Sequence, residues 1–92
     1  MTPEEFDTAL QADGYSAAIP VEWPPGYSLG DHQHPFDACA LITSGEFSLT
    51  VDGQRRTYAV GDIFRLPAGT EHIEDAGPEG AAYLSCRRQT PA

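Results

Sequence analysis

The sequence predicts an all-β domain with one short helix near its N-terminus. A helix-start pattern is confined to the N-terminal segment, and beyond Tyr15 short apolar runs alternate with turn sequences. One turn, Asp52-Gly53, lies between two such runs and is typical of a β-hairpin. At 92 residues the chain has the length of one domain. We therefore expect a single domain over residues 1–92, with a sandwich or barrel over about 16–88 and a frayed tail over 89–92.

The helix is predicted over residues 3–12. The run Thr2–Glu5 reads Thr-Pro-Glu-Glu, which supplies an N-cap, a proline in the first turn and a glutamate three residues after the cap. Phe6 and Leu10 follow at helical spacing, and Gly14 is a natural stop. We expect the two apolar side chains to pack against the barrel or against a partner subunit.

The rest of the chain is divided by turn sequences into short strands. Within the predicted hairpin, residues 47–51 and 55–58 are the two strands. Regular spacing of short strands is typical of a sandwich or barrel, and a jelly roll is one form of it. The turn sequences are Pro24-Pro25-Gly26, Ser44-Gly45, Asp52-Gly53, Pro67-Ala68-Gly69 and Gly77-Pro78-Glu79-Gly80.

Composition excludes several classes of partner. The net charge is −9, from 14 acidic and five basic residues. An acidic surface repels phosphate backbones, so we expect no nucleic-acid partner. No basic amphipathic stretch and no apolar run of the length of a membrane span is found, so we expect no membrane partner. The N-terminal residues lack the pattern of a signal peptide, which predicts a cytoplasmic protein. A domain this small has a thin core and exposed sheet edges, and a homodimer would cover them.

Two cysteines, Cys39 and Cys86, are too few for a disulfide framework and lie in apolar strand-like runs. We interpret them as reduced, buried thiols. A redox or substrate role for Cys39 is the alternative.

All three histidines of the chain occur at positions that suggest one metal site. His32 and His34 are two residues apart, so on a strand both imidazoles would point to the same face. His72 follows the Pro67–Gly69 turn and opens another strand. Neutral imidazoles converging from two strands suit a divalent cation such as Zn, Ni or Fe(II). The alternative is a pocket in which the histidines only bind water.

The segments that carry these histidines resemble the two sequence motifs of the cupins. Residues 26–45 read Gly, five residues, His-x-His and a closing Gly, and residues 61–72 read Gly, five residues, Pro-x-Gly, two residues and His. The resemblance covers roughly residues 20–86. It implies a small cupin β-barrel, a jelly roll of two antiparallel sheets, in which His32, His34 and His72 hold a metal ion.

Two positions depart from the family pattern. The metal-binding Glu of the first motif is Ala38 here, and the Asn that ends the second motif is Ala76. Asp37 and Cys39 flank the first of these, but strand alternation turns both to the opposite face. The resemblance therefore implies a site of three histidines with open positions. Fe(II), Ni or Zn would suit it better than manganese or magnesium, which prefer oxygen ligands.

A small-molecule cavity is expected beside the metal. If Ala38 faces inward, Ala40 and Ile42 do so too, forming an apolar wall for a small, largely uncharged molecule. Glu74 lies two residues after His72 and shares its face. It could act as a general base or a replacement ligand, or it could lie at a solvent-exposed rim. We predict that Ala38, Ala40, Ile42 and Glu74 contact the ligand.

Other side chains leave their roles open. Trp23 and Tyr27 flank the Pro-Pro-Gly turn and fit either core or lid packing or stacking on a ligand. Arg65 lies between Phe64 and Leu66 and is expected to face outward, with an anion-binding role as the alternative.

Three function classes follow. The first, which we favour, is a module that binds a divalent metal and a small molecule. The second is a metal-dependent enzyme, since three-histidine cupins include dioxygenases acting on thiols and diketones. The third is a metal-free structural or interaction domain. The sequence does not assign a catalytic residue, and whether the chain is an enzyme stays open.

Overall fold

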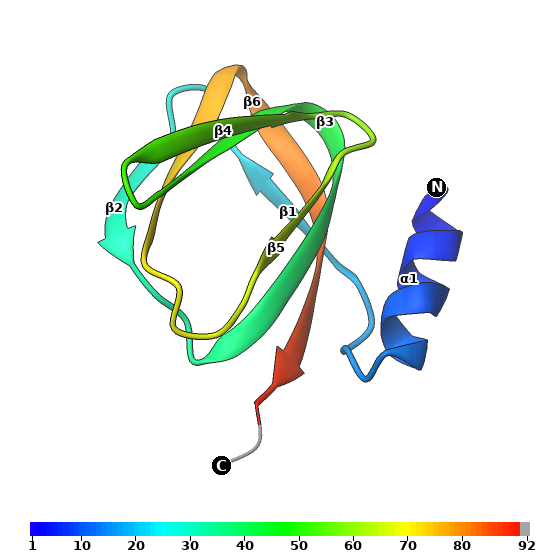
Figure 1. The fold of residues 1–92 in the computed structure, drawn as a ribbon. Helices are drawn as coiled ribbons and strands as arrows, with labels where there is room; N and C mark the ends of the chain where they lie inside the picture. The colour runs from blue at the N-terminus through cyan, green and yellow to red at the C-terminus, as the bar shows by residue number, and fades with distance from the viewer. Residues whose placement is uncertain (91–92) are drawn as a thin grey trace.

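The computed structural model describes residues 1–90 as a helix packed beside a β-barrel (Figure 1). Every strand pair in this range is antiparallel. The elements are α1 (Pro3–Ala12), β1 (Ile19–Trp23), β2 (Ser28–His32), β3 (Phe36–Val51), β4 (Gln54–Ala59), β5 (Ile63–Leu66) and β6 (His72–Gln89).

The long strands β3 and β6 pair with each other and run through both layers of the barrel. The first part of β3 pairs with β5, and its second part pairs with β4. Likewise the first part of β6 pairs with β2, and its second part with β1. The layers are therefore β2-β6-β3-β4 and β1-β6-β3-β5, which confirms the predicted jelly roll of two antiparallel sheets.

Glycines allow β3 and β6 to pass from one layer to the other. The register between the two strands shifts on both sides of Gly45, which has φ +67°. A Cβ atom at Gly45 would collide with the carbonyl oxygen of Gly80, itself at φ +81°. Only glycine combines a positive φ with so close a backbone approach.

The helix forms where its sequence predicts it. The Thr2 hydroxyl accepts from the Glu5 backbone N–H at 3.1 Å, and the Glu5 carboxylate accepts from the Thr2 N–H at 2.8 Å. Phe6 and Leu10 are buried against the outer face of the barrel, in a cluster that also contains Cys39. Of the two packing alternatives, the structure shows the barrel. Both cysteines are buried free thiols, as predicted, and burial raises the pKa of each.

A second cluster fills the barrel interior and supports the candidate site. Aromatic rings of Phe47, Phe64 and Tyr83 lie with centroids 5.1–5.6 Å apart. This cluster comprises Ala38, Ala40, Ile42, Phe47, Leu49, Phe64, Leu66, Ala81 and Tyr83. The Asp52-Gly53 hairpin joins β3 to β4, with φ +52° and +75° at its two residues.

Three details differ from the sequence-based expectation. Ser44-Gly45 and Gly77–Gly80, predicted as turns, lie inside the continuous strands β3 and β6. His34 lies outside β2, in the link to β3, so strand alternation alone does not orient it. Gln89, expected in the frayed tail, pairs with Phe36 and extends β6, while residues 91–92 lie outside the described range. Within that range, no helix combines the length and apolar character needed to cross a membrane.

Candidate metal centre

Three histidines and one glutamate converge at one end of the barrel. The four are His32, His34, His72 and Glu74, and one potential ligand atom from each lies within 4.8 Å of the others. Donors bound to one ion at about 2.0–2.2 Å lie roughly 3–4 Å from one another. The cluster is thus close to the spacing that a shared divalent ion requires.

Strand pairing brings these residues together. His32 at the end of β2 is directly opposite His72 at the start of β6, and Leu29 is opposite Glu74. The Gly69 N–H donates to the His34 carbonyl at 2.9 Å, which attaches the link after β2 to the turn before β6. The Pro-x-Gly turn and the His-x-His segment are therefore held in contact.

Backbone carbonyls fix the orientation of two imidazoles. His32 Nδ1 lies 2.7 Å from the Gly30 oxygen, and His72 Nδ1 lies 2.9 Å from the Thr70 oxygen. Because a carbonyl oxygen only accepts, each Nδ1 carries the hydrogen, and the Nε2 of a neutral ring is left with a lone pair. Hydrogen bonds of this kind orient metal-ligating histidines.

The carboxylate of Glu74 lies among these lone pairs. Its Oε2 is 3.1 Å from Nε2 of His32 and of His72, and 4.0 Å from Nε2 of His34. Lone pairs facing a carboxylate oxygen repel it unless a proton or a metal ion lies between them. One divalent ion would satisfy all four atoms at once, so the donor set fits a metal.

The surroundings of His34 favour the protonation state that a metal ligand needs. Burial first, and then the neighbouring His72 and His32, lower the pKa of His34, which favours the neutral imidazole. The Tyr27 hydroxyl donates to Glu74 Oε1 at 3.2 Å. Burial and the nearby Glu74 carboxylate raise the pKa of Tyr27 to about 12, so the phenol remains a donor.

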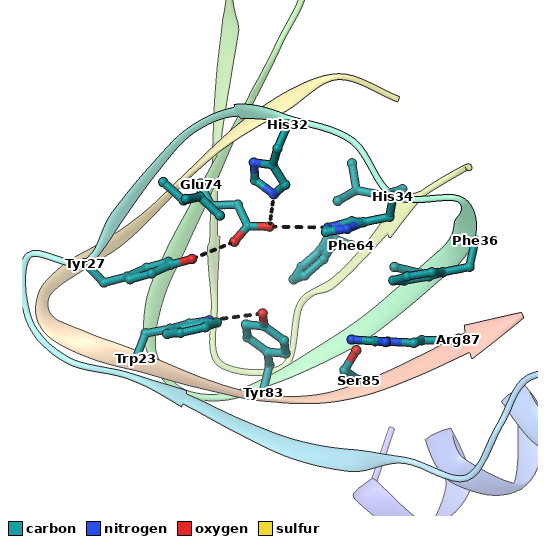
Figure 2. A pocket seen from close by; sticks show the side chains of 13 residues that line it. Trp23, Tyr27, His32, His34, Phe36, Phe64, Glu74, Tyr83, Ser85 and Arg87 are labelled. Atoms are coloured by element: carbon teal, nitrogen blue, oxygen red, sulfur yellow. Dashed lines mark hydrogen bonds and ion pairs between the residues drawn. The ribbon is translucent and has the colours of Figure 1, made fainter. Parts of the chain in front are cut away.

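A cavity of about 250 Å³ opens beside the cluster (Figure 2). His32 and Glu74 lie on one side of it, and Tyr83, Ser85 and Arg87 of β6 lie on the other. The lining consists of Trp23, Tyr27, Leu29, His32, His34, Phe36, Ala38, Phe64, Leu66, Glu74, Tyr83, Ser85 and Arg87.

The sequence profile of the cupin domain matches residues 20–84. This match covers most of the chain and includes all four residues of the cluster. The chain belongs to the cupin family.

Individual relatives were found by sequence and by structure. The cupin is 28% identical over 79 residues to "Endoribonuclease YbeY" of Myxococcus xanthus; the match covers 85% of the chain but only 27% of that relative. A solved structure of a conserved protein of unknown function from Streptococcus pyogenes is 28% identical, with a TM-score of 0.71. That alignment covers 83% of this cupin and 66% of the other chain, just under two thirds.

A second similar structure, from Rhizobium leguminosarum, shows the fold alone. It is 20% identical with a TM-score of 0.73, and the alignment covers 98% of this cupin and 95% of that chain. The barrel and the helix together therefore have a counterpart of nearly the same size.

Of the four residues predicted to contact a ligand, two line the cavity and two do not. Ala38 and Glu74 line the cavity. Ala40 and Ile42 do not line it; they are on the same face of β3 but lie in the barrel core, each 1% exposed. Glu74 is 8% exposed, so the alternative that placed it at a solvent-exposed rim is wrong.

Residues flanking Ala38 face away from the cavity, as strand alternation predicts. Asp37 accepts from the Ala68 N–H at 2.9 Å and from Arg88, and Cys39 is in the cluster under α1. Arg65 is exposed, as expected.

The aromatic pair beside the cluster packs as one unit. Trp23 and Tyr27 stack at 4.0 Å between centroids with an interplanar angle of 7°. The Trp23 indole N–H donates to the Tyr83 hydroxyl at 3.1 Å. Both rings line the cavity, so they lie where a ligand would contact them.

The sequence-based reasoning missed Tyr83, Ser85 and Arg87. Their positions alternate along β6 from Ala81 and Tyr83, which lie in the core cluster; all three line the cavity, and Arg87 is also exposed to solvent. The place of Arg87 in the cavity depends on the pairing of β6 with β3, which the local sequence does not give.

Proposed function

We propose that this cupin is a module that binds a divalent metal ion through His32, His34, His72 and Glu74 and a small molecule in the adjoining cavity. The observation that carries the proposal is the convergence of four donor atoms, with two Nε2 lone pairs directed at the Glu74 carboxylate. Family membership supports it, since the three histidines occupy the metal-binding positions of the cupin motifs.

Fe(II), Ni or Zn is the proposed ion. Imidazole suits these metals, and a single carboxylate is compatible with each of them. When bound, the ion would act as a Lewis acid and hold the oxygen atoms of a ligand in the cavity. The chain itself orients the donors through the Gly30 and Thr70 carbonyls and keeps the Glu74 carboxylate hydrogen-bonded to Tyr27.

Metal analysis of protein purified without an affinity tag tests this proposal. The parent should contain close to one divalent ion per chain, and His72→Ala or Glu74→Gln should lower its metal affinity by at least about tenfold. Glu71→Gln is the matched control, because it neutralises an exposed carboxylate one residue before His72. Parent protein that binds no divalent metal would contradict the proposal and leave a metal-free cupin. A His72→Ala variant with unchanged affinity would also contradict it, because the ion would then bind elsewhere.

A metal-dependent enzyme is the second candidate. The cavity is lined by His32, His34 and Glu74, so a ligand in it would reach a bound ion directly. An oxygenase should consume oxygen when the ferrous-loaded protein is offered small thiols or diketones, and His34→Ala should abolish this. Ligands that raise the melting temperature without any turnover would favour the binding module.

The endoribonuclease activity named for the Myxococcus relative is not proposed for this cupin. The match covers 27% of that protein, so the activity can belong to the part that has no counterpart here. A net charge of −9 also opposes contact with an RNA backbone.

A further inference from the structure

The cavity has a second polar end, formed by Arg87. Its guanidinium lies 4.3 Å from the centroid of the Phe36 ring and lines the cavity beside Ser85 (Figure 2). Among the residues described, no carboxylate lies within ion-pair distance of it, whereas the neighbouring Arg88 pairs with Asp37 and Asp13. The planar set of N–H donors on Arg87 is therefore available to a ligand.

One aromatic ring separates the two polar ends. Phe36 stacks on His34 with centroids 5.0 Å apart, and the Arg87 guanidinium lies over the same Phe36 ring. The cavity volume of about 250 Å³ corresponds to roughly eight water molecules at ~30 Å³ each. A molecule with a similar number of non-hydrogen atoms could reach from the metal cluster to Arg87.

The charge of the cavity favours an anionic molecule, in place of the largely uncharged one expected from the sequence. A divalent ion contributes +2, Glu74 −1 and Arg87 +1, so the loaded cavity is positive although the whole chain carries −9. Ala38 strengthens this effect, because the position lines the cavity without the carboxylate that the family motif places there. Large polyanions would be repelled by the surface, while a small anion would be attracted into the cavity.

We propose that the cavity binds a short-chain carboxylic acid that carries a carbonyl or hydroxyl oxygen at its other end. Arg87 pairs with the carboxylate through two parallel N–H donors, and Ser85 lies beside it to supply a further hydrogen bond. The second oxygen would reach a metal ion held by the four clustered donors, and Phe64 and Leu66 line the cavity where the apolar chain between the two ends would lie. This proposal rests on the metal site proposed above and names the class of ligand for it.

Two compounds of matched size test the proposal. 4-Oxopentanoate carries a carboxylate and a ketone, and hexane-2,5-dione replaces the carboxylate with a second methyl ketone. Calorimetric titration of the zinc-loaded full chain should show tighter binding of the acid than of the diketone. Arg87→Gln should weaken binding of the acid more than tenfold and leave the diketone unaffected. Arg87→Lys should give an intermediate loss, since it keeps the charge but not the planar fork.

Arg65→Gln is the control, because it removes the same charge from an exposed position outside this cavity. Bound zinc is measured in every preparation, so affinity is compared per ion. Zinc-loaded protein that fails to bind the acid, or equal losses in the Arg87 and Arg65 variants, would overturn the ligand class and leave the metal site standing. Parent protein that does not bind zinc would instead overturn the proposed function. The metal analysis detects this outcome independently of the ligand titration.

Discussion

Glu74 is the side chain that gives the cluster its negative charge. It is buried, its Oε2 faces three imidazoles, and its Oε1 accepts from Tyr27. In the cupin motif a carboxylate comes instead from the position of Ala38 on β3. This chain thus offers a carboxylate from β6 to a cavity that Ala38 also lines. In the proposed site the acidic donor is therefore on β6, whereas the family motif places it on β3.

A carboxylate swap tests this interpretation. Glu74→Ala should lower zinc affinity, because it removes the only carboxylate among the four clustered donors. Adding Ala38→Glu to that variant should restore part of the loss, since the new carboxylate enters the same cavity. Competition with a zinc-binding dye measures both affinities. Equal affinity in the single and double variants would show that position 38 cannot replace Glu74.

Asp37 provides a pH-dependent contact on the outer face of β3. Hydrogen bonds from the Ala68 N–H and from Arg88 hold the pKa of Asp37 below its usual value. A carboxyl group whose pKa is lower in the folded state stabilises the fold at pH values above its unfolded pKa, about 3.9. That stabilisation is lost as the pH falls through the folded pKa.

Asp37→Asn should therefore lower the urea midpoint at neutral pH, and the difference from the parent should shrink as the pH falls below about 4. Asp31→Asn, which changes an exposed aspartate in β2, is the control. A deficit in Asp37→Asn that is the same at all pH values would contradict the assignment.

Sequence alone predicted the three histidines of the site because their spacing is a local pattern. It left Glu74 undecided, since alternation from His72 gives its face but not its burial, which depends on contacts with His32 and Tyr27. It missed Arg87, whose place in the cavity depends on the pairing of β6 with β3 near Phe36. Local sequence patterns could not assign these two residues, because tertiary contacts determine their orientation.

At the scale of helices and strands, the same distinction between local signals and tertiary contacts holds. The helix was predicted to the residue because its capping box and proline are local signals. The hairpin was predicted because Asp-Gly readily adopts the positive φ angles that a two-residue hairpin turn requires. The length of β3 and β6 was not predicted, because Ser44-Gly45 and Gly77–Gly80 resemble turns in sequence. In the structure they are points where two continuous strands bend between the layers.

Gly45 is the position at which this bend can be tested. Gly45→Ala should lower the free energy of unfolding for two reasons. The alanine would have to keep a positive φ, which costs about 1–3 kcal/mol, and its methyl group would collide with the Gly80 carbonyl. Gly53→Ala is the matched control, with φ +75° and nothing near its new methyl group. Urea denaturation should show Gly45→Ala less stable than Gly53→Ala by at least about 1 kcal/mol. Equal losses would show that the collision is relieved at little cost.

At the scale of the whole molecule, the chain has a net charge of −9, and the candidate site brings together four potential ligands of a cation. The edge strand β1 exposes Ile19, and Val60 is also exposed, so the homodimer expected from the sequence stays a prediction that light scattering can check. The four clustered donors come from β2, β6 and the link between β2 and β3. A bound ion would therefore connect segments that are distant in sequence, and its effect should extend to global stability.

Metal binding should accordingly raise the melting temperature, by an amount that grows with the logarithm of the ratio of free ion to Kd. Free zinc at about 100 times its Kd stabilises a folded state by about 2.7 kcal/mol. For a domain of this size each kcal/mol shifts the Tm by roughly 4–8 °C, so a rise on the order of 10–20 °C is expected. Magnesium, which prefers oxygen ligands, should give a smaller shift, and a chelator should reverse the zinc effect. A variant with alanine at all three histidines is the control. An equal rise in that variant would place the stabilising ion elsewhere, because only the proposed site depends on those imidazoles.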